Sequence, residues 1–186
     1  DMESLRATIS RVLRVIMFLT IPAAIGLALL RGPATVLLLQ RGEFTATDAA
    51  ITASALGWYC LGIIPQAGIE IHSRGFYALG DTRSPVILAV GAVIVNFVLS
   101  AALWGRFEHE GLAFSVSAAS WAEWLLLWRA YGRRTGATAA PDLAHIARIS
   151  LAAAAMALFM AVGFSRYEHA TMAQNAVTAI AGAAAG

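Results

Sequence analysis

The sequence predicts an all-α, polytopic transmembrane helical bundle of about six membrane helices, and three observations lead to this fold class. Of the 186 residues, 59% are hydrophobic and 13% are charged, whereas soluble globular domains average about 45–50% apolar and about 25% charged residues. The mean hydropathy is +0.71. Several apolar runs approach or exceed the roughly 20 residues that cross a bilayer core. A soluble core of this size cannot bury so much apolar surface, so the lipid bilayer is the expected solvent.

The first four predicted spans occupy residues 15–39, 49–72, 85–104 and 111–128. Pro22 is expected to bend the first span, because proline removes a backbone donor and clashes with the preceding turn. Arg31-Gly-Pro33 is expected to interrupt the same span near its end. The second span follows a polar loop over residues 40–48, and Thr47 or Asp48 is its expected N-cap.

The chain divides into three predicted regions. Residues 1–134 hold the four spans, residues 135–145 form a cytoplasmic linker, and residues 146–186 hold additional C-terminal helices. In the last region, residues 146–164 form a fifth span and residues 172–186 are too few for a complete sixth. We therefore expect the chain to be the C-terminal portion of a longer membrane protein, or the product of a truncated gene.

Arginine is distributed unequally between the two predicted sides of the membrane, and this predicts the orientation. The richer side holds Arg6, Arg11, Arg14, Arg74, Arg83, Arg129, Arg133, Arg134 and Arg148. The poorer side holds Arg31, Arg41, Arg106 and Arg166. The positive-inside rule places the richer side in the cytoplasm. The net charge of only +2 gives no indication of a nucleic-acid partner.

The connector between the second and third spans, residues 74–85, is the most polar segment that joins two long apolar runs. Gly80 and Asp81 predict a turn, since glycine tolerates positive φ and aspartate bonds its own backbone. Ser84 is the expected N-cap of the next helix, and Pro85 its first helical residue. The predicted cytoplasmic hinge motif consists of Gly80, Asp81, Thr82, Arg83 and Pro85.

Glu70 is the strongest single candidate for function, because a charge at the centre of a membrane helix costs about 2.5–3.5 kcal/mol even on the lenient insertion scale. Two interpretations stay open. Glu70 either lines a water-filled cavity or pairs with Arg74 four residues later near the helix end. Arg74 likewise either holds a pyrophosphate in that cavity or anchors the helix among lipid headgroups. His72 is expected to be a hydrogen-bonded interfacial residue.

A second group of polar residues lies within the third and fourth spans. Asn96 is, with Glu70 and Arg74, a candidate to line the cavity. It shares one helix face with Ser100, one turn later, and Ser115 and Ser117 begin the fourth span. Interhelical hydrogen bonding is the more common role of such residues in membranes. The sequence shows no metal-ligand spacing, nucleophile motif or paired catalytic carboxylates, so no enzyme and no cofactor is predicted.

Three segments resemble one known family. Residues 76–86, Phe76-Tyr-Ala-Leu-Gly-Asp-Thr-Arg-Ser-Pro-Val86, closely resemble the connector signature of the MurJ/MviN family of lipid-linked peptidoglycan precursor flippases. Residues 40–48 are similar to a loop of that family, and residues 111–115 to one of its helix starts. The three matches occur in the family's order, which makes the resemblance specific.

The resemblance implies the architecture of the multidrug/oligosaccharidyl-lipid/polysaccharide (MOP) exporters, of which this chain holds the second lobe. The implied activity is flipping of lipid II, the undecaprenyl-pyrophosphate-linked precursor, from the inner to the outer leaflet of the bacterial cytoplasmic membrane. The implied partners are the bilayer, that precursor and a missing N-terminal lobe. Coupling to Na⁺, H⁺ or the membrane potential is expected. A sodium site over Asn96, Ser100, Ser115 and Ser117 is the weakest implication, because Ser100 stands where the family has a carboxylate.

Two alternatives stay open. The nearer is an exporter of another lipid-linked oligosaccharide, or of a drug, in the same superfamily. The more distant is a membrane glycan polymerase, which would need an acidic catalytic residue in an outer loop. Its candidates are Glu43, Asp48, Glu108 and Glu110, whose simpler interpretation is that of solvated loop residues.

Overall fold

Three long helices make up most of the protein. The computed structural model describes residues 2–136, 147–160 and 162–163. Its elements are α1 (Met2–Leu39), α2 (Ala46–Ala78) and α3 (Arg83–Thr135), followed by a shorter apolar helix, Ala147–Met160. Each of the three long helices is long and apolar enough to cross a membrane. The described residues therefore form a multi-pass membrane protein of helices alone, which confirms the predicted fold class.

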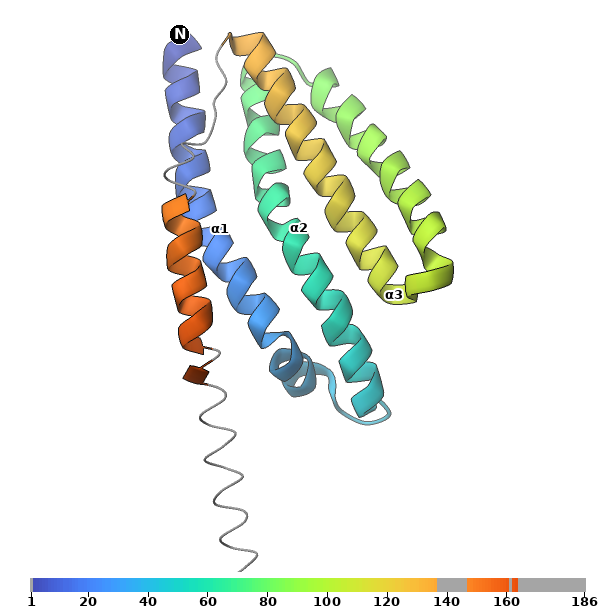
Figure 1. Ribbon diagram of the computed structural model, residues 1–186. Coiled ribbons are helices and arrows are strands. Elements are labelled where there is room, and N and C mark those ends of the chain that lie inside the picture. The colour runs from blue at the N-terminus through green and yellow to red at the C-terminus, as the bar shows by residue number, and fades with distance from the viewer. Residues whose placement is uncertain (1, 137–146, 161, 164–186) are drawn as a thin grey trace, which may run out of the picture.

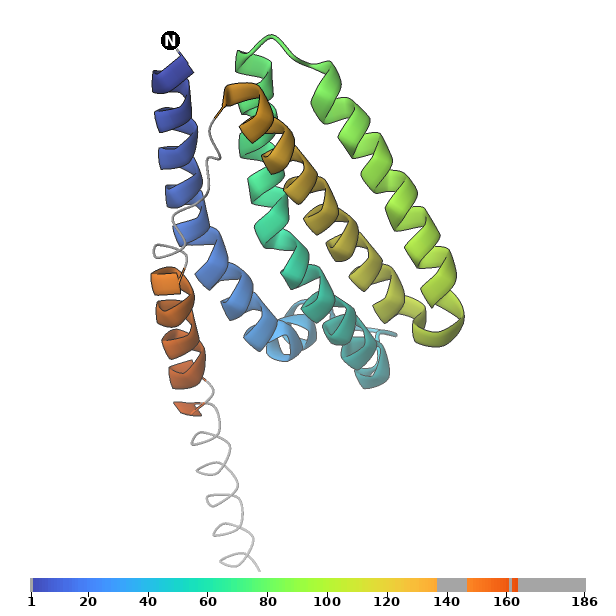
Figure 2. The same ribbon diagram turned by 45° about the horizontal axis from the view of Figure 1, so that its top comes forward.

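α3 folds back on itself. The backbone of Glu108 has φ 43° and ψ −119°, outside the helical region, although the residues on both sides are helical. Figures 1 and 2 show the resulting hairpin, whose first leg (83–107) and second leg (109–135) run in opposite directions. The interval between the predicted third and fourth spans, residues 105–110, is thus helical except for one sharp reversal at Glu108. The predicted third and fourth spans lie in the two legs.

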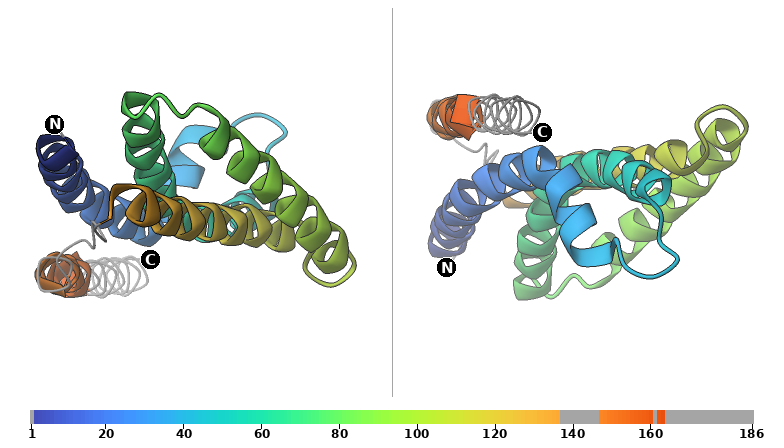
Figure 3. Two further views of the ribbon diagram at one scale, coloured as in Figure 1. Left: turned by 90° about the horizontal axis from the view of Figure 1, so that it is seen from above. Right: turned by 90° about the horizontal axis from the view of Figure 1, so that it is seen from below.

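The helices alternate in direction and pack around one core. α2 contacts both α1 and α3, and its N-terminal end lies beside the reversal of α3 (Figure 1). The most completely buried large side chains of the core come from all three helices: Leu13, Met17, Phe76, Leu127 and Tyr131, each at most 2% exposed. Viewed along the helices in Figure 3, α2 and the two legs of α3 form a triangle, with α1 on one side.

The helix Ala147–Met160 lies along α1 (Figures 1 and 3). Ile149 and Ala153 join the core cluster, and a Cβ at Gly26 would lie 3.8 Å from the Cε atom of Met156. The predicted fifth span, residues 146–164, is described only in part. Residues 137–145 of the predicted linker and the predicted sixth span, residues 172–186, lie outside the described residues. The count of six spans therefore stays a prediction.

The predicted interruption of the first span at residues 31–33 is wrong, because α1 continues through Pro22 and Pro33 to Leu39. Membrane helices tolerate proline where neighbouring groups satisfy the freed backbone. Pro33 removes the backbone donor for the carbonyl four residues earlier. The helix nevertheless continues, and the Thr35 hydroxyl donates an additional hydrogen bond to the Arg31 carbonyl (2.7 Å). Figure 1 shows that α1 changes direction along its length and remains a helix.

The N-cap of α2 also differs from the prediction. Thr45 caps this helix, its hydroxyl accepting a hydrogen bond from the Asp48 backbone N–H (3.2 Å). The Asp48 carboxylate accepts the Thr45 N–H in return (2.9 Å). The two residues form a capping box, which satisfies two backbone donors that the first helical turn leaves free. Thr47 lies inside the helix.

Candidate functional site

One face of α2 is polar and exposed. Gln66, Glu70, Arg74 and Tyr77, which we call the polar stripe, follow one another at intervals of four, four and three residues, so they share a helix face. All four are exposed. Gln66 also reaches across to α3, where its amide nitrogen donates to the Ser120 hydroxyl (2.9 Å). A cavity of about 360 Å³ adjoins the stripe at this point, between α2 and the second leg.

Glu70 and Arg74 form the predicted pair across one helical turn. Arg74 donates from Nε (2.8 Å) and Nη2 (2.7 Å) to the same carboxylate oxygen of Glu70. The side chain of Glu70 remains 63% exposed and that of Arg74 70%. In water such a pair contributes only about 0.2–0.5 kcal/mol. Both charges thus stay together on an open face of an apolar helix, where each keeps hydrogen-bonding capacity for a further group.

The opposite face of α2 packs tightly against the second leg of α3. Gly68 and Gly75 let the helices approach on this face, since a Cβ at Gly68 would lie only 2.2 Å from Nε1 of Trp124, and one at Gly75 would lie 2.8 Å from the Tyr131 ring. Small residues at membrane helix interfaces allow this close approach. This glycine face, Gly68 and Gly75, fixes the rotation of α2. Glu70 and Arg74 therefore point away from the interface, whereas Gln66 lies at its edge and reaches Ser120.

His72 belongs to this packed interface. It is hydrogen-bonded, as expected, and is fully buried between the two helices. Its side chain is 0% exposed, and Nδ1 lies 2.8 Å from the Gly68 carbonyl oxygen. The ring makes edge contacts with Trp124 and Tyr131. This burial could not be predicted from the sequence, because both aromatic partners lie more than 50 residues away along the chain.

The hinge between α2 and α3 is a capped turn, as predicted. Gly80 has φ 72°, a conformation that favours glycine. α3 begins at Arg83, however, one residue before the predicted cap, and Thr82 makes no side-chain capping bond. Asp81 replaces Ser84 as the capping side chain, since its carboxylate accepts the backbone N–H groups of Arg83 (3.1 Å) and Ser84 (3.0 Å).

Asp81 also connects the hinge to the far end of α3. Its Oδ2 accepts the Ser84 hydroxyl (2.6 Å) and lies 2.9 Å from Nη2 of Arg134. The hydrogen bonds from Ser84 hold the pKa of Asp81 below its ordinary value, with smaller contributions from Arg134 and the Arg83 N–H. Pro85 is buried in the first turn of α3, where proline's missing N–H leaves no intrahelical bond unmade. Asp81 thus caps the N-terminal end of α3 and forms an ion pair with Arg134 near its C-terminal end.

The four residues of the weakest predicted site bond in three separate places. The Ser100 hydroxyl donates to Oδ1 of Asn96 (3.2 Å) within the first leg. Ser115 is 0% exposed and bonds the carbonyl of Gly111 in its own helix. Ser117 donates to the Trp58 carbonyl of α2 (2.7 Å), which is the interhelical role predicted for such serines. Among the described residues, no hydrogen bond joins the Asn96–Ser100 pair to either serine of the second leg.

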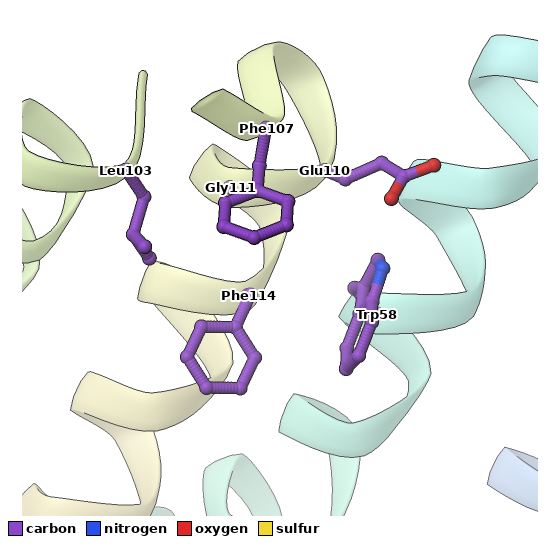
Figure 4. Close-up of a pocket in the computed structure, with 6 residues that line it drawn as sticks. All are labelled: Trp58, Leu103, Phe107, Glu110, Gly111 and Phe114. Atoms are coloured by element: carbon purple, nitrogen blue, oxygen red, sulfur yellow. The ribbon is translucent and has the colours of Figure 1, made fainter. Parts of the chain in front are cut away.

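A second hollow lies at the opposite end of the bundle from the hinge. It has a volume of about 230 Å³ and is lined by Trp58, Leu103, Phe107, Glu110, Gly111 and Phe114. Figure 4 shows the three aromatic rings and Leu103 around it, with the Glu110 carboxylate reaching toward α2. That carboxylate is hydrogen-bonded to the Ser54 hydroxyl and is half-buried, so the interpretation of Glu110 as a solvated loop residue is wrong.

Comparison with known proteins identifies the family. The family model described as "Lipid II flippase MurJ" matches residues 1–181. A "Probable lipid II flippase MurJ" of Rhizobium meliloti (strain 1021) is 35% identical over 153 residues, which are 78% of this chain and 28% of that protein. A "Lipid II flippase MurJ" of Burkholderia cenocepacia is 32% identical over 122 residues, 66% of this chain and 24% of that protein.

A solved structure has the same fold. The chain is similar to "Lipid II flippase MurJ, inward closed conformation" with a TM-score of 0.79 and 24% sequence identity, over 88% of this chain and 34% of that one. The chain thus spans about a third or less of the relatives that it matches. Because the family model covers nearly the whole chain, the predicted resemblance is confirmed, and this multi-pass membrane protein belongs to the MurJ family of lipid II flippases.

Proposed function

We propose that this chain forms part of a lipid II flippase of the bacterial cytoplasmic membrane, in which it works together with a further lobe. The observation that carries the proposal is the exposed Glu70–Arg74 pair on α2. Charged side chains within membrane helices normally face a bundle interior or a water-filled cavity, because exposure to acyl chains is costly. The polar stripe is therefore the face that α2 turns toward a polar transport path.

Arg74 is the proposed contact for the pyrophosphate of the substrate. Its guanidinium is 70% exposed and its Nη1 atom has no hydrogen bond among the described residues. Guanidinium recognises phosphate oxygens in a bidentate geometry. Glu70 holds the guanidinium in place along the helix. Na⁺, H⁺ or the membrane potential is the proposed driving force.

Alternating access supplies the movement in this proposal. A sugar–pyrophosphate headgroup cannot cross hydrocarbon unaided, so one lobe must rock against another around a shielded path while the lipid tail stays in the bilayer. The glycine face makes α2 and the second leg one packed body that can move as a unit. The hinge, tied to Arg134 through Asp81, keeps the two ends of α3 together during that motion.

A chimera tests the proposal. The matched segment of the Rhizobium meliloti relative is replaced by this chain, and growth is measured after depletion of the host's own flippase. We expect the chimera to restore growth and Arg74→Ala to abolish it, while Arg41→Ala, an exposed arginine in the loop between α1 and α2, leaves it unchanged. Growth that depends on neither arginine would refute the role of the polar stripe.

The same system separates the alternatives. An exporter of another lipid-linked oligosaccharide or of a drug would fit into the bundle without restoring growth. A membrane polymerase would lose activity when Glu43, Asp48, Glu108 and Glu110 are neutralised together. A flippase would keep lipid II translocation in that variant, after correction for the loss of the Thr45–Asp48 capping box. Proteoliposomes with imposed Na⁺ or pH gradients then identify the coupling ion.

A further inference from the structure

The hollow in Figure 4 combines aromatic walls with one carboxylate. The rings of Trp58 and Phe114 meet edge to face, with centroids 5.4 Å apart and planes at 87°. Phe107 closes a third side. The absence of a side chain at Gly111 brings the two legs of α3 together here, since a Cβ would lie 3.0 Å from the Leu103 Cβ. The result is a small apolar hollow that is partly open, since Trp58, Phe107 and Phe114 are all exposed.

Glu110 gives this hollow its charge. Its carboxylate accepts one hydrogen bond, from Ser54, and in the part of the chain that the structure describes it has no arginine or histidine partner. A half-buried carboxylate favours a cation beside it, because removal from water weakens its hydration. Aromatic faces attract the same kind of group, and aromatic cages are a recurring way to bind ammonium ions. The lining therefore selects an organic cation.

The position of the hollow indicates where that cation comes from. It lies beside the reversal of α3 at Glu108, at the end of two membrane legs, where headgroups meet the protein. Trp104 packs against His109 at this same end (ring centroids 6.0 Å), and tryptophan is enriched at membrane interfaces. A volume of about 230 Å³ holds an aminoethyl group but is smaller than the pockets that enclose whole drug-sized ligands.

We propose that this hollow binds the ammonium group of an aminophospholipid headgroup, with the ammonium between the Glu110 carboxylate and the rings of Trp58 and Phe114. A neutral glycerol headgroup would leave the carboxylate without a counter-charge, so the hollow discriminates against phosphatidylglycerol. The site is separate from the polar stripe and does not depend on the proposed transport activity.

Lipid retention measures the preference. The full chain is placed in nanodiscs of equal parts phosphatidylethanolamine and phosphatidylglycerol, and the lipids that stay bound on release are counted by native mass spectrometry. A cation–aromatic contact of about 0.5–2 kcal/mol corresponds to an enrichment of about 2- to 30-fold for phosphatidylethanolamine. N-acetylated phosphatidylethanolamine, which has no ammonium charge, is expected to lose this enrichment.

Three variants assign the preference to the hollow. Glu110→Gln keeps an acceptor for Ser54 and is expected to abolish the enrichment, so that the bound lipids have the composition of the bulk bilayer. Trp58→Leu keeps the backbone carbonyl that accepts the Ser117 hydrogen bond and is expected to reduce the enrichment in part. Glu108→Gln, two residues away and exposed, is the matched control and should retain it. Any of three results would overturn the proposal: no enrichment of phosphatidylethanolamine in the wild type, an unchanged enrichment in Glu110→Gln, or binding of free ethanolamine to the same occupancy as phosphatidylethanolamine.

Discussion

Replacing Gly68 with alanine is expected to disturb the contact between α2 and the second leg of α3. The added Cβ would lie 2.2 Å from Nε1 and 2.3 Å from Cε2 of Trp124, distances that real atoms do not reach. Trp124 is 8% exposed and packs against Trp121, with ring centroids 5.3 Å apart. Its indole also contacts the rings of His72 and Trp121, and either the indole or the helix must shift to admit the new Cβ.

The magnitude follows from two opposing effects. Overpacking of a well-packed core costs about 1–3 kcal/mol, whereas alanine in place of glycine in a helix gains about 1 kcal/mol. We expect a net destabilisation of about 1 kcal/mol for Gly68→Ala. Gly91 is the matched control, because it lies in the first leg with no atom within 4 Å of its Cβ position. Gly91→Ala is therefore expected to stabilise by about 1 kcal/mol.

Thermal unfolding of the chain in detergent, followed by size-exclusion chromatography of the heated samples, measures the difference. With about 2–4 °C per kcal/mol for a chain of this length, the two variants should differ by about 4–8 °C in Tm. Trp124→Phe removes Nε1, the nearest clashing atom, so it should make Gly68→Ala less harmful, with a coupling of about 0.5 kcal/mol or more. A Gly68→Ala Tm equal to or above that of Gly91→Ala would refute the close packing of this interface.

Three further changes test the caps and the reversal, each by Tm in detergent. Thr45→Ala should lower the free energy of unfolding by about 0.5–2 kcal/mol through loss of the capping box. Thr47→Ala, inside α2, is the control and should change the Tm little. Equal decreases in Tm for the two variants would contradict the assignment of Thr45 as the cap. Glu108→Gly should stabilise by about 1 kcal/mol, since glycine adopts the positive φ without strain, and a lower Tm would contradict that strain. Asp81→Asn should lower the Tm at neutral pH, because the carboxylate is held by Ser84 and Arg134. Its folded-state pKa is lowered, so this contribution is present above about pH 4 and disappears as the pH falls below it; a gap between wild type and variant that is independent of pH would contradict this.

The local patterns of the sequence were sufficient for the helices and the hinge. Long apolar runs predict membrane helices because the bilayer accepts no unpaired backbone groups. Gly80 and Asp81 predict the turn because only a few residue types adopt its backbone conformation. The Glu70–Arg74 pair was predicted as one of two alternatives, since residues four apart on a helix are always neighbours. In each case the partners lie within a few residues of each other.

Exact helix ends were less predictable. Thr45, Thr47 and Asp48 are all good capping residues, and so are Asp81 and Ser84. Propensity alone does not distinguish between such neighbours, because the choice depends on which backbone N–H groups the surrounding packing leaves free. The structure selects Thr45 for α2 and the Asp81 carboxylate for α3.

The sequence by itself determined that the chain is a helical membrane protein, where its long helices run, and that one polar turn joins two of them. Only the tertiary structure decided that His72 is buried, that Asp81 pairs with Arg134, and that Glu110 lines a hollow with Trp58. The physical reason is distance along the chain. Hydrophobicity and backbone preference act over single helical turns, whereas these contacts join residues about 50 positions apart. They also depend on how closely two helices approach where glycine leaves room between them.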